Sequence, residues 1–204
     1  MLRHLVIFAK EPRLGAVKSR LARDIGAAAA LRFYEETLHA LIARVAHRAP
    51  WRCWLAVTPD GFAPLAQRRW RSLPRDLAVI AQGQGDLGVR MARSFARLPP
   101  GPAVLIGSDI PAIARSHIDD AFAALGRHDA VFGPAEDGGY WLVGLKRAPR
   151  VLAPFARVRW SGPHALADTR ANLKRKRVAL APRLGDVDRA EDLRRERGRF
   201  GRLI

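Results

Sequence analysis

The 204-residue sequence is poor in cysteine, lysine and acidic residues, and Cys53 is its only cysteine. One cysteine excludes an internal disulfide framework, and the scattered histidines offer no partner set with it for zinc or iron. No stretch approaches eighteen uninterrupted apolar residues, which excludes an ordinary membrane-spanning helix. The first residues lead straight into a short strand without a signal-peptide cleavage site. We therefore expect a cytoplasmic protein without a membrane span.

The shortage of acidic residues gives the chain a formal net charge of +17, which raises the hypothesis of nucleic-acid binding. Lysine, however, contributes only 5 of the 36 basic residues. The arginines are scattered, and short clusters such as residues 174–177 resemble a solvated helix end more than an aromatic-basic platform. The pattern argues against a dedicated nucleic-acid role, while the positive field still favours anionic substrates.

The length and the 49% hydrophobic content fit one globular domain over residues 1–204. Short apolar strands alternate with amphipathic helices, which predicts an α/β fold with a largely parallel sheet. The expected strands are residues 5–9, 51–57, 77–81, 103–106 and 130–134, a strand opened by Gly138-Gly139, and residues 178–181. The expected helices are residues 27–48, 62–70, 87–98, 117–125, 148–155 and 164–174, and a terminal helix that begins near Asp188.

The apolar run 103–106 ends abruptly at Gly107-Ser108-Asp109, and Pro111 prevents the strand from continuing. A carboxylate is therefore expected at the carboxyl end of a strand, which is the edge where open α/β sheets bind ligands. The alternative is a Ser-Asp turn that merely follows a buried strand.

A cation-rich loop follows the first strand, and Pro12 and Gly15 mark it as a loop. A strand, then a loop with glycine and clustered cations, then a helix, is a layout that cradles phosphates. Neither the Walker P-loop nor the dinucleotide-binding fingerprint is present. We favour anion binding over a plain basic surface loop, because the loop follows the strand's carboxyl end. Its four cations are Lys10, Arg13, Lys18 and Arg20.

Two further glycine-containing segments follow strands. In residues 82–88, Asp86 is expected to cap the following helix, and the glycines also permit close approach of a ligand. In Gly138-Gly139, acids on one side and aromatics on the other favour ligand contact over a simple hairpin. Ser116 is expected to cap the helix 117–125, and Asp188 with Glu191 forms a possible capping box at the terminal helix.

Five motifs follow one another along the chain: FAKEPxxGxVKSRL from Phe8, GDLGxRM from Gly85, GSDIP from Gly107, EDGGYWLVGL from Glu136 and DVDxxEDL from Asp186. In this order they resemble the bacterial DUF2064 family, often labelled glycosyltransferases, within the nucleotide-diphospho-sugar transferase (GT-A) superfamily. Its neighbours there include the guanylyltransferases of molybdenum-cofactor and coenzyme F420 biosynthesis. The resemblance covers nearly the whole chain.

The resemblance implies a single-domain, Rossmann-like GT-A fold: a mostly parallel mixed sheet with helices on both faces and the first and fourth strands adjacent. It implies that Asp109, with Asp188 as the second ligand, binds Mg²⁺ or Mn²⁺, although Ala190 replaces the usual proline and helix capping remains an alternative for Asp188. The implied catalytic residues are Asp109, Lys18 and Asp137. The implied nucleotide-binding residues are Ala9, Lys10, Gly15, Lys18, Arg20, Gly85, Asp86, Ser108, Gly138 and Gly139.

The function expected from the resemblance is a metal-dependent transferase with a nucleotide donor, either an NTP or an NDP-sugar, and an unidentified small-molecule acceptor. Nucleotidyl transfer is slightly favoured, because Gly107 stands where many glycosyltransferases have the first acid of an Asp-x-Asp motif and because the first loop is rich in cations. The alternatives are a glycosyltransferase that uses an NDP-sugar and a non-enzymatic basic nucleic-acid-binding protein.

Overall fold

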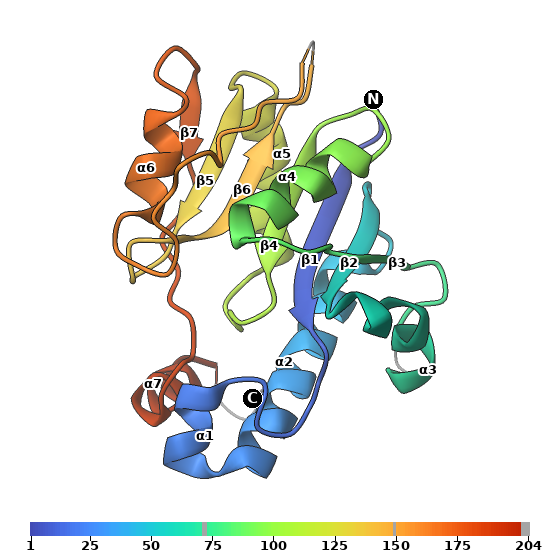
Figure 1. The fold of residues 1–204 in the computed structure, drawn as a ribbon, viewed down its shortest axis with the longest axis vertical. Coiled ribbons are helices and arrows are strands. Elements are labelled where there is room, and N and C mark those ends of the chain that lie inside the picture. Colours follow the sequence, from blue (N-terminus) through green and yellow to red (C-terminus); the bar gives the residue numbers. More distant parts are fainter. Residues whose placement is uncertain (71–72, 149, 201–204) are drawn as a thin grey trace.

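The computed structural model describes residues 1–70, 73–148 and 150–200, and a seven-stranded sheet forms its centre (Figure 1). Across the sheet the strands follow the order β3-β2-β1-β4-β6-β5-β7. Their bounds are β1 His4–Lys10, β2 Arg52–Thr58, β3 Ala78–Ala81, β4 Ala103–Gly107, β5 Ala130–Pro134, β6 Tyr140–Leu145 and β7 Val178–Leu180.

The sheet is mixed and mostly parallel, as expected. Strands β1 to β4 run parallel, β6 is antiparallel to β4 and β5, and β7 is parallel to β5. Strands β1 and β4 are neighbours, with Phe8 opposite Gly107, which confirms the adjacency of the first and fourth strands. Because the strand order reverses between them, the loops after β1 and β4 leave the sheet together at a topological switch point.

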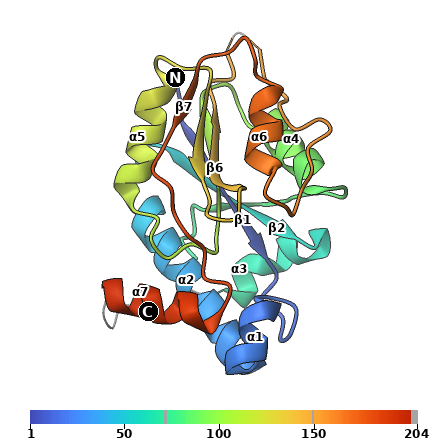
Figure 2. The same ribbon diagram turned by 90° about the vertical axis from the view of Figure 1, so that its left-hand side faces the viewer.

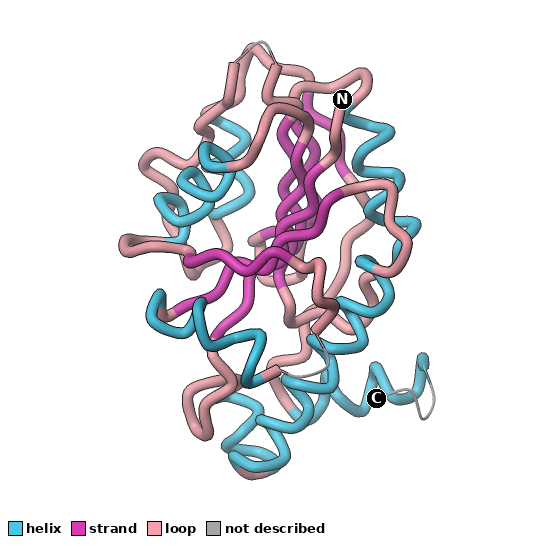
Figure 3. The backbone as a smooth tube through the Cα atoms, turned by 90° about the vertical axis from the view of Figure 1, so that its right-hand side faces the viewer, coloured by secondary structure: helices cyan, strands magenta, loops and turns pink. Residues whose placement is uncertain are grey.

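Helices cover both faces of the sheet (Figures 2 and 3). Helices α2 and α5 lie on one face, and α4 and α6 lie on the other (Figure 2). Within the segments that the structure describes, no helix has the length and apolar character needed to cross a membrane. The helix bounds are α1 Ser19–Ile25, α2 Ala27–Ala46, the 3-10 helix η1 Asp60–Leu65, α3 Ala66–Arg69, α4 Leu87–Arg97, α5 Arg115–Leu125, α6 Ala165–Ala171 and α7 Ala190–Phe200.

Alternation along β1 divides the core into two layers. Leu5 and Ile7 are fully buried in the cluster that includes α2 and α5, whereas Val6 packs in the cluster of Met91 and Phe95 from α4. Successive strand residues point to opposite faces, so a continuous apolar strand is what a sheet covered on both faces requires. Burial on both sides fixes the register of β1, and with it the position of the loop that follows.

A third, smaller cluster docks the C-terminal helix near the start of the chain. Leu21 of α1, Phe33 of α2, and Val187 and Leu193 at the start of α7 are buried together. Val187 is fully buried. Its neighbours in sequence, Asp186 and Asp188, are thereby held beside the loop that leads into α1.

Several sequence expectations about helices differ from the structure. Instead of one helix over residues 62–70, the chain forms the 3-10 helix η1 and the short α3. The described part of 148–155 forms no helix, and residue 149 lies outside the described residues; the apolar side chains of this segment pack against the α4 layer from an irregular chain. Helix α5 begins at Arg115 rather than at 117, and the His117 ring accepts from the Ala114 N–H at 3.1 Å in place of a Ser116 cap. Helix α1 was not expected as a separate element, and Gly26, at φ 88°, separates it from α2.

Candidate active site

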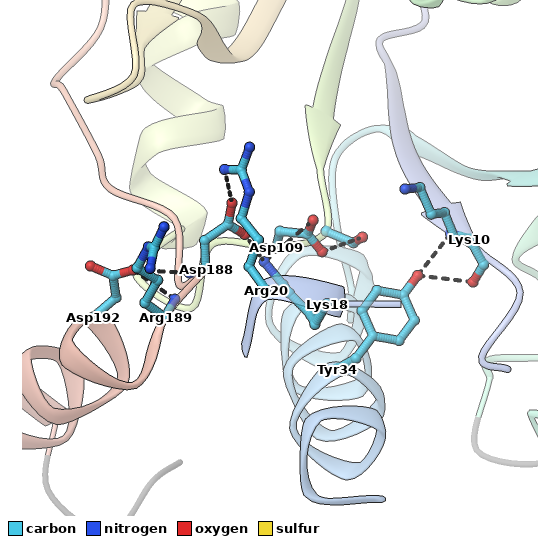
Figure 4. Close-up of polar contacts among 9 residues, drawn as sticks. Lys10, Lys18, Arg20, Tyr34, Asp109, Asp188, Arg189 and Asp192 are labelled. Carbon is cyan, nitrogen blue, oxygen red and sulfur yellow. Dashed lines mark hydrogen bonds and ion pairs between the residues drawn. The ribbon is translucent and has the colours of Figure 1, made fainter. Parts of the chain in front are cut away.

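Lys18 lies at the centre of a polar cluster on the edge where β1 and β4 end. Its Nζ is 3.4 Å from Oδ2 of Asp109 and 3.2 Å from Oδ1 of Asp188, and the side chain is only 3% exposed (Figure 4). Arg20 reaches Oδ2 of Asp188 at 3.2 Å from the exposed side. Three distant segments therefore meet here: the loop before α1, the turn after β4 and the entry to α7.

The burial of Lys18 requires its two carboxylates. An ammonium ion removed from water is tolerated only when it is paired and hydrogen-bonded. Lys18 also has a left-handed backbone conformation, at φ 47° and ψ 45°, at the N-cap of α1. Strained conformations of this kind persist where the surrounding structure holds them, and they cluster at functional sites. The chain thus holds this lysine between Asp109 and Asp188 despite the cost to its backbone.

Asp188 does not cap the terminal helix with its side chain. Asp192 accepts hydrogen bonds from the N–H groups of Asp188 at 3.1 Å and Arg189 at 2.9 Å, which makes it the capping acid (Figure 4). The expectation that Asp188 and Glu191 form the capping box is therefore wrong. The Asp188 carboxylate faces Lys18 and Arg20 instead.

Tyr34 of α2 fixes the end of β1. Its hydroxyl accepts from the Lys10 N–H at 2.7 Å and donates to the Lys10 carbonyl at 2.9 Å (Figure 4). Burial is the main cause that raises the pKa of Tyr34, and the nearby Asp109 carboxylate adds to it. The phenol therefore stays neutral and serves as both donor and acceptor, which sets where the cation-rich loop begins.

Two cavities meet beside Asp109. The smaller, of about 200 Å³, contains the expected residues Ala9, Lys10, Lys18 and Ser108, together with Asp109. The larger, of about 290 Å³, is lined by the expected Asp137 and Gly139 and also reaches Asp109. The residues common to both are Phe8, Leu87, Gly107 and Asp109.

The remaining expected residues lie outside the described lining of both cavities. Asp86 caps α4 by accepting from the Val89 N–H at 2.8 Å, which confirms that it is a helix cap. Its expected contact with a nucleotide stays a prediction. Gly85, at φ 109°, would bring a Cβ to 2.9 Å from the Val89 side chain. Gly15 lies in open space, and Arg20 pairs with Asp188.

Gly138 has a packing reason to be glycine. Its φ is 85°, and a Cβ there would lie 2.4 Å from the Pro163 carbonyl oxygen. Its own carbonyl accepts from the Leu166 N–H at 3.1 Å. The next residue differs: the Gly139 N–H donates to Oδ1 of Asp137 at 2.8 Å, and Gly139 lines the larger cavity. Gly138 thus lets the chain pass close to Pro163, and Gly139 forms part of the wall of the larger cavity.

Sequence reasoning missed Gln82 and Arg90. The buried Gln82 amide donates to the Ala9 carbonyl at 3.1 Å and the Ala56 carbonyl at 2.9 Å, and its oxygen accepts from Arg90 at 2.9 Å. Gln82 therefore ties the end of β3 to β1 and β2 and aims Arg90 along the smaller cavity. The sequence offered one signal for Gln82: a side-chain amide directly after the strand that ends at Ala81.

Sequence reasoning also missed Trp160 and Asp186, which line the larger cavity. Trp160 packs over α4 because residue 88 is glycine: a Cβ on Gly88 would lie 2.7 Å from its ring. Asp186 lies two residues before Asp188, so the Asp-x-Asp spacing that is absent at residues 107–109 occurs at 186–188. Burial chiefly raises the pKa of Asp186, and the Asp188 carboxylate raises it further.

The raised pKa of Asp186 predicts that Asp186→Asn stabilises the fold at neutral pH. Ionisation of this carboxyl is easier in the unfolded chain, so native stability falls as pH rises from the unfolded-state pKa to the folded-state pKa, and the cost is complete above the folded-state pKa. Below the ordinary aspartate pKa both states are protonated, and the cost is absent. Thermal unfolding between pH 3 and pH 8 should show a variant advantage that is present at pH 7 and disappears in acid. An advantage equal at all pH values contradicts this origin.

Asp109 and Asp188 fit a hard divalent cation. Both carboxylates contact the same ammonium ion, so their oxygens converge on one point. No group of three or more His, Cys, Asp or Glu side chains forms a ready metal cage among the residues with a described position. Mg²⁺ characteristically takes one or two carboxylates and completes its shell with water and substrate phosphates. The pair therefore suits Mg²⁺ or Mn²⁺ that binds together with a phosphate-bearing ligand.

Comparison with solved structures supports the fold. A Desulfovibrio desulfuricans G20 protein, provisionally assigned as a nucleotide-diphospho-sugar transferase, has a TM-score of 0.89 at 27% identity, over 98% of this chain and 90% of that one. The inositol-1-phosphate CTP transferase of T. maritima has a TM-score of 0.59 at 11% identity, and the match covers 94% of this chain and 91% of that one. Rv0371c of Mycobacterium tuberculosis H37Rv, in complex with manganese, has a TM-score of 0.59 at 19% identity, and the match covers 96% of this chain and 97% of that one.

Comparison of sequences identifies the family. No curated protein matches the chain. Residues 41–162 match the family described as uncharacterized protein conserved in bacteria, DUF2064. The matched segment covers more than half of the sequence and includes the whole of β2, β3, β4, β5 and β6. Together with a fold shared with nucleotide-sugar and nucleotidyl transferases, this match shows that the chain belongs to the bacterial DUF2064 family.

Proposed function

We propose that the protein is a transferase that moves a group from a nucleotide donor to a small-molecule acceptor, with nucleotidyl transfer from an NTP favoured. The observation that carries this proposal is the pair of cavities that meet at Asp109 and Gly107, beside a buried lysine held by two carboxylates. Donor and acceptor can then occupy separate cavities with their reacting atoms at the junction, which is what a two-substrate transfer requires.

The smaller cavity is the donor side. Its lining carries three cations, Lys10, Lys18 and Arg90, against one carboxylate, Asp109. Donor phosphates carry several negative charges, and cations oriented in advance stabilise the charge that develops on a leaving phosphate. In this proposal Lys18 contributes most to the binding of the donor phosphates, because it can replace a carboxylate contact by a phosphate oxygen without leaving its buried position.

Asp109 and Asp188 hold the divalent cation in this proposal. When bound, Mg²⁺ or Mn²⁺ supplies Lewis-acid stabilisation to the donor phosphates. Asp109 and Asp188 would hold the cation, and Lys18, which lies between them, would then donate to a phosphate oxygen of the donor.

The larger cavity is the acceptor side. In nucleotidyl transfer the acceptor oxygen forms a bond to the α-phosphorus of the NTP, the bond from that phosphorus to the bridging oxygen breaks, and pyrophosphate leaves. The acceptor proton passes to a carboxylate of the cavity. Asp137 is the candidate, because Oδ1 is engaged by the Gly139 N–H while Oδ2 has no partner among the described residues. Its role is that of a general base.

Glycosyl transfer from an NDP-sugar is the second candidate. The fold match to a provisionally assigned nucleotide-diphospho-sugar transferase favours it, and the Asp-x-Asp spacing at residues 186–188 supplies the paired acids absent at 107–109. In that reaction the acceptor oxygen bonds to the sugar's anomeric carbon and the NDP leaves with the bond's electron pair.

A donor screen tests the proposal and separates its two forms. The protein is incubated with the four NTPs and a set of NDP-sugars, with and without Mn²⁺, and thermal unfolding and product release are followed. Metal-dependent stabilisation by an NTP with pyrophosphate release supports nucleotidyl transfer, and NDP release supports glycosyl transfer. If no nucleotide raises the unfolding temperature, the donor-site assignment fails. Nucleic-acid affinity that falls steeply with salt and is unchanged in Asp109→Asn would favour the third alternative.

Gly107→Leu should block transfer without unfolding the protein. Gly107 lies at the junction of the cavities, and a Cβ there would meet no atom within 4 Å. A leucine side chain therefore enters the space where the reactants meet, and a small misplacement of reacting groups costs on the order of a hundredfold in rate. Product release and thermal unfolding measure the two effects, with Gly107→Ala as the control. Equal turnover in the two variants would show that the reactants do not meet there.

A further inference from the structure

The larger cavity differs sharply in charge from the rest of the protein. The chain has 36 lysines and arginines against 19 acidic residues. Yet the described lining of this cavity includes no lysine, arginine or histidine, and it does include three carboxylates, Asp109, Asp137 and Asp186. In a chain with a net charge of +17, a cavity whose charged lining residues are all acidic has a charge that the overall composition does not explain.

Two cations beside this cavity are already paired with carboxylates. Lys18 pairs with Asp109 and Asp188. Arg159, next to Trp160, forms a bidentate ion pair with Asp168: Nε donates to Oδ2 at 2.9 Å and Nη2 donates to Oδ1 at 2.8 Å. Asp137 and Asp186 have no cationic partner within ion-pair distance among the described residues. The uncompensated charge that faces this cavity is therefore negative.

A bound cation at Asp109 and Asp188 does not reverse this sign. A nucleotide donor brings the negative charges of its phosphates, more for an NTP than for an NDP-sugar, and the cation would be shared with them at the junction. Asp137 and Asp186 remain on the opposite side of that junction, in the larger cavity alone.

The rest of the lining is aromatic and aliphatic. Phe8, Tyr140 and Trp160 contribute rings, and Trp160 is held by Tyr140 at 6.3 Å and Phe155 at 6.5 Å between ring centroids. Such walls bind the apolar face of a ring, and carboxylates at the rim accept hydrogen bonds from hydroxyl or amino groups.

We propose that the acceptor is an uncharged or cationic molecule that presents a ring face to Trp160 and hydroxyl or amino groups to Asp137 and Asp186, and that phosphorylated and carboxylate acceptors are rejected. This assignment rests on the proposed function for the division into donor and acceptor sides. Negative charge in the acceptor faces two carboxylates without a compensating cation, and like charges brought together in a partly desolvated cavity repel strongly.

Phenyl β-D-glucoside and phenyl β-D-glucuronide form a matched pair of probes, because they differ only in a hydroxymethyl group against a carboxylate. Binding is followed by tryptophan fluorescence at low ionic strength, where screening is weak. The glucoside should bind at least tenfold more tightly than the glucuronide. Equal or tighter binding of the glucuronide, or no binding of the glucoside at tens of millimolar, overturns the proposal.

Two variants connect the result to the cavity. Trp160→Phe should remove most of the fluorescence response to the glucoside. The double variant Asp137→Asn with Asp186→Asn should reduce the tenfold ratio to about one, and the single Asp137→Asn serves if the double variant does not fold. An unchanged ratio in the neutralised variant contradicts the assigned cause.

Thermal stabilisation by nucleotide and Mn²⁺, measured on the same preparations, separates this inference from the proposed function. Nucleotide binding together with preference for the glucuronide overturns only the acceptor class. Preference for the glucoside without any nucleotide binding keeps the charge selectivity of the cavity but overturns its assignment to an acceptor.

Discussion

Lys18→Met is expected to lower turnover by about a hundred- to a thousandfold and to weaken donor binding by about ten- to a hundredfold. Methionine keeps most of the side-chain volume but removes the ammonium that lies 3.4 Å from Asp109 and 3.2 Å from Asp188. A charge-assisted hydrogen bond to a phosphate contributes about 1.5–3 kcal/mol, which corresponds to this range of affinity. Loss of one preorganised group at the transition state costs on the order of 10²–10³ in turnover.

The Lys18→Met variant should still fold. Its two carboxylates are 49% and 33% exposed, so water can solvate them once the ammonium is absent. The remaining cost is the repulsion of two half-exposed acids, which Arg20 partly offsets from the side of Asp188. Circular dichroism and thermal unfolding check this expectation before activity is compared.

Arg20→Met is the matched control. Arg20 contacts the same Asp188 at 3.2 Å, but its side chain is 68% exposed, and exposed ion pairs contribute little. Nucleotide titration of both variants, with and without Mn²⁺, measures the difference. Donor affinity that falls equally in the two variants would mean that general positive charge attracts the nucleotide, with no special role for the buried lysine.

The architecture was predictable because burial on both faces leaves a strong pattern. Continuous apolar strands such as 5–9 and 103–106 alternate with amphipathic helices, and this order specifies a mostly parallel sheet. The adjacency of the first and fourth strands came from family resemblance, because strand order is not encoded in local periodicity. The wrong helix at 148–155 has a related cause: apolar side chains can reach the core from an irregular chain as well as from a helix.

The candidate site was only partly predictable. Lys18 and Asp109 could be expected at the same edge, because each follows the carboxyl end of one of two neighbouring strands. Their contact with Asp188 depends on the packing of Val187 and Leu193 against α1 and α2, which no local pattern specifies. The larger cavity is harder still, since its lining comes from segments spread between Phe8 and Asp186. Its acidic character emerges only when those segments are brought together.

The wall of that cavity makes Gly138→Ala a substitution with a large expected effect on stability. A non-glycine residue at φ 85° costs about 1–2 kcal/mol in backbone strain alone. A Cβ would also lie 2.4 Å from the carbonyl oxygen and 2.5 Å from the Cα of Pro163, and backbone atoms cannot rotate away as a side-chain end can. The total cost should be roughly 3 kcal/mol or more. For a chain of this size that lowers the unfolding temperature by roughly 6–12 °C.

Gly162→Ala is the matched control for this substitution. Gly162 precedes Pro163 in the segment that packs against Gly138, but a Cβ on Gly162 would meet nothing within 4 Å. Its substitution should change the unfolding temperature by no more than about 2 °C, since only the backbone entropy of the unfolded chain differs. Scanning calorimetry compares the two variants directly.

The same comparison tests how the cavity is built. Residues 160–166 pack against the connection between β5 and β6 where Pro163 lies close to Gly138. The Leu166 N–H also donates to the Gly138 carbonyl at 3.1 Å. If Gly138→Ala displaces this segment, Trp160 moves with it, and fluorescence quenching by phenyl β-D-glucoside should fall in Gly138→Ala but not in Gly162→Ala. Nucleotide binding in the smaller cavity should survive in both, because Gly138 and Gly162 are outside its described lining. Loss of nucleotide binding in Gly138→Ala alone would show that the two cavities fold as one unit.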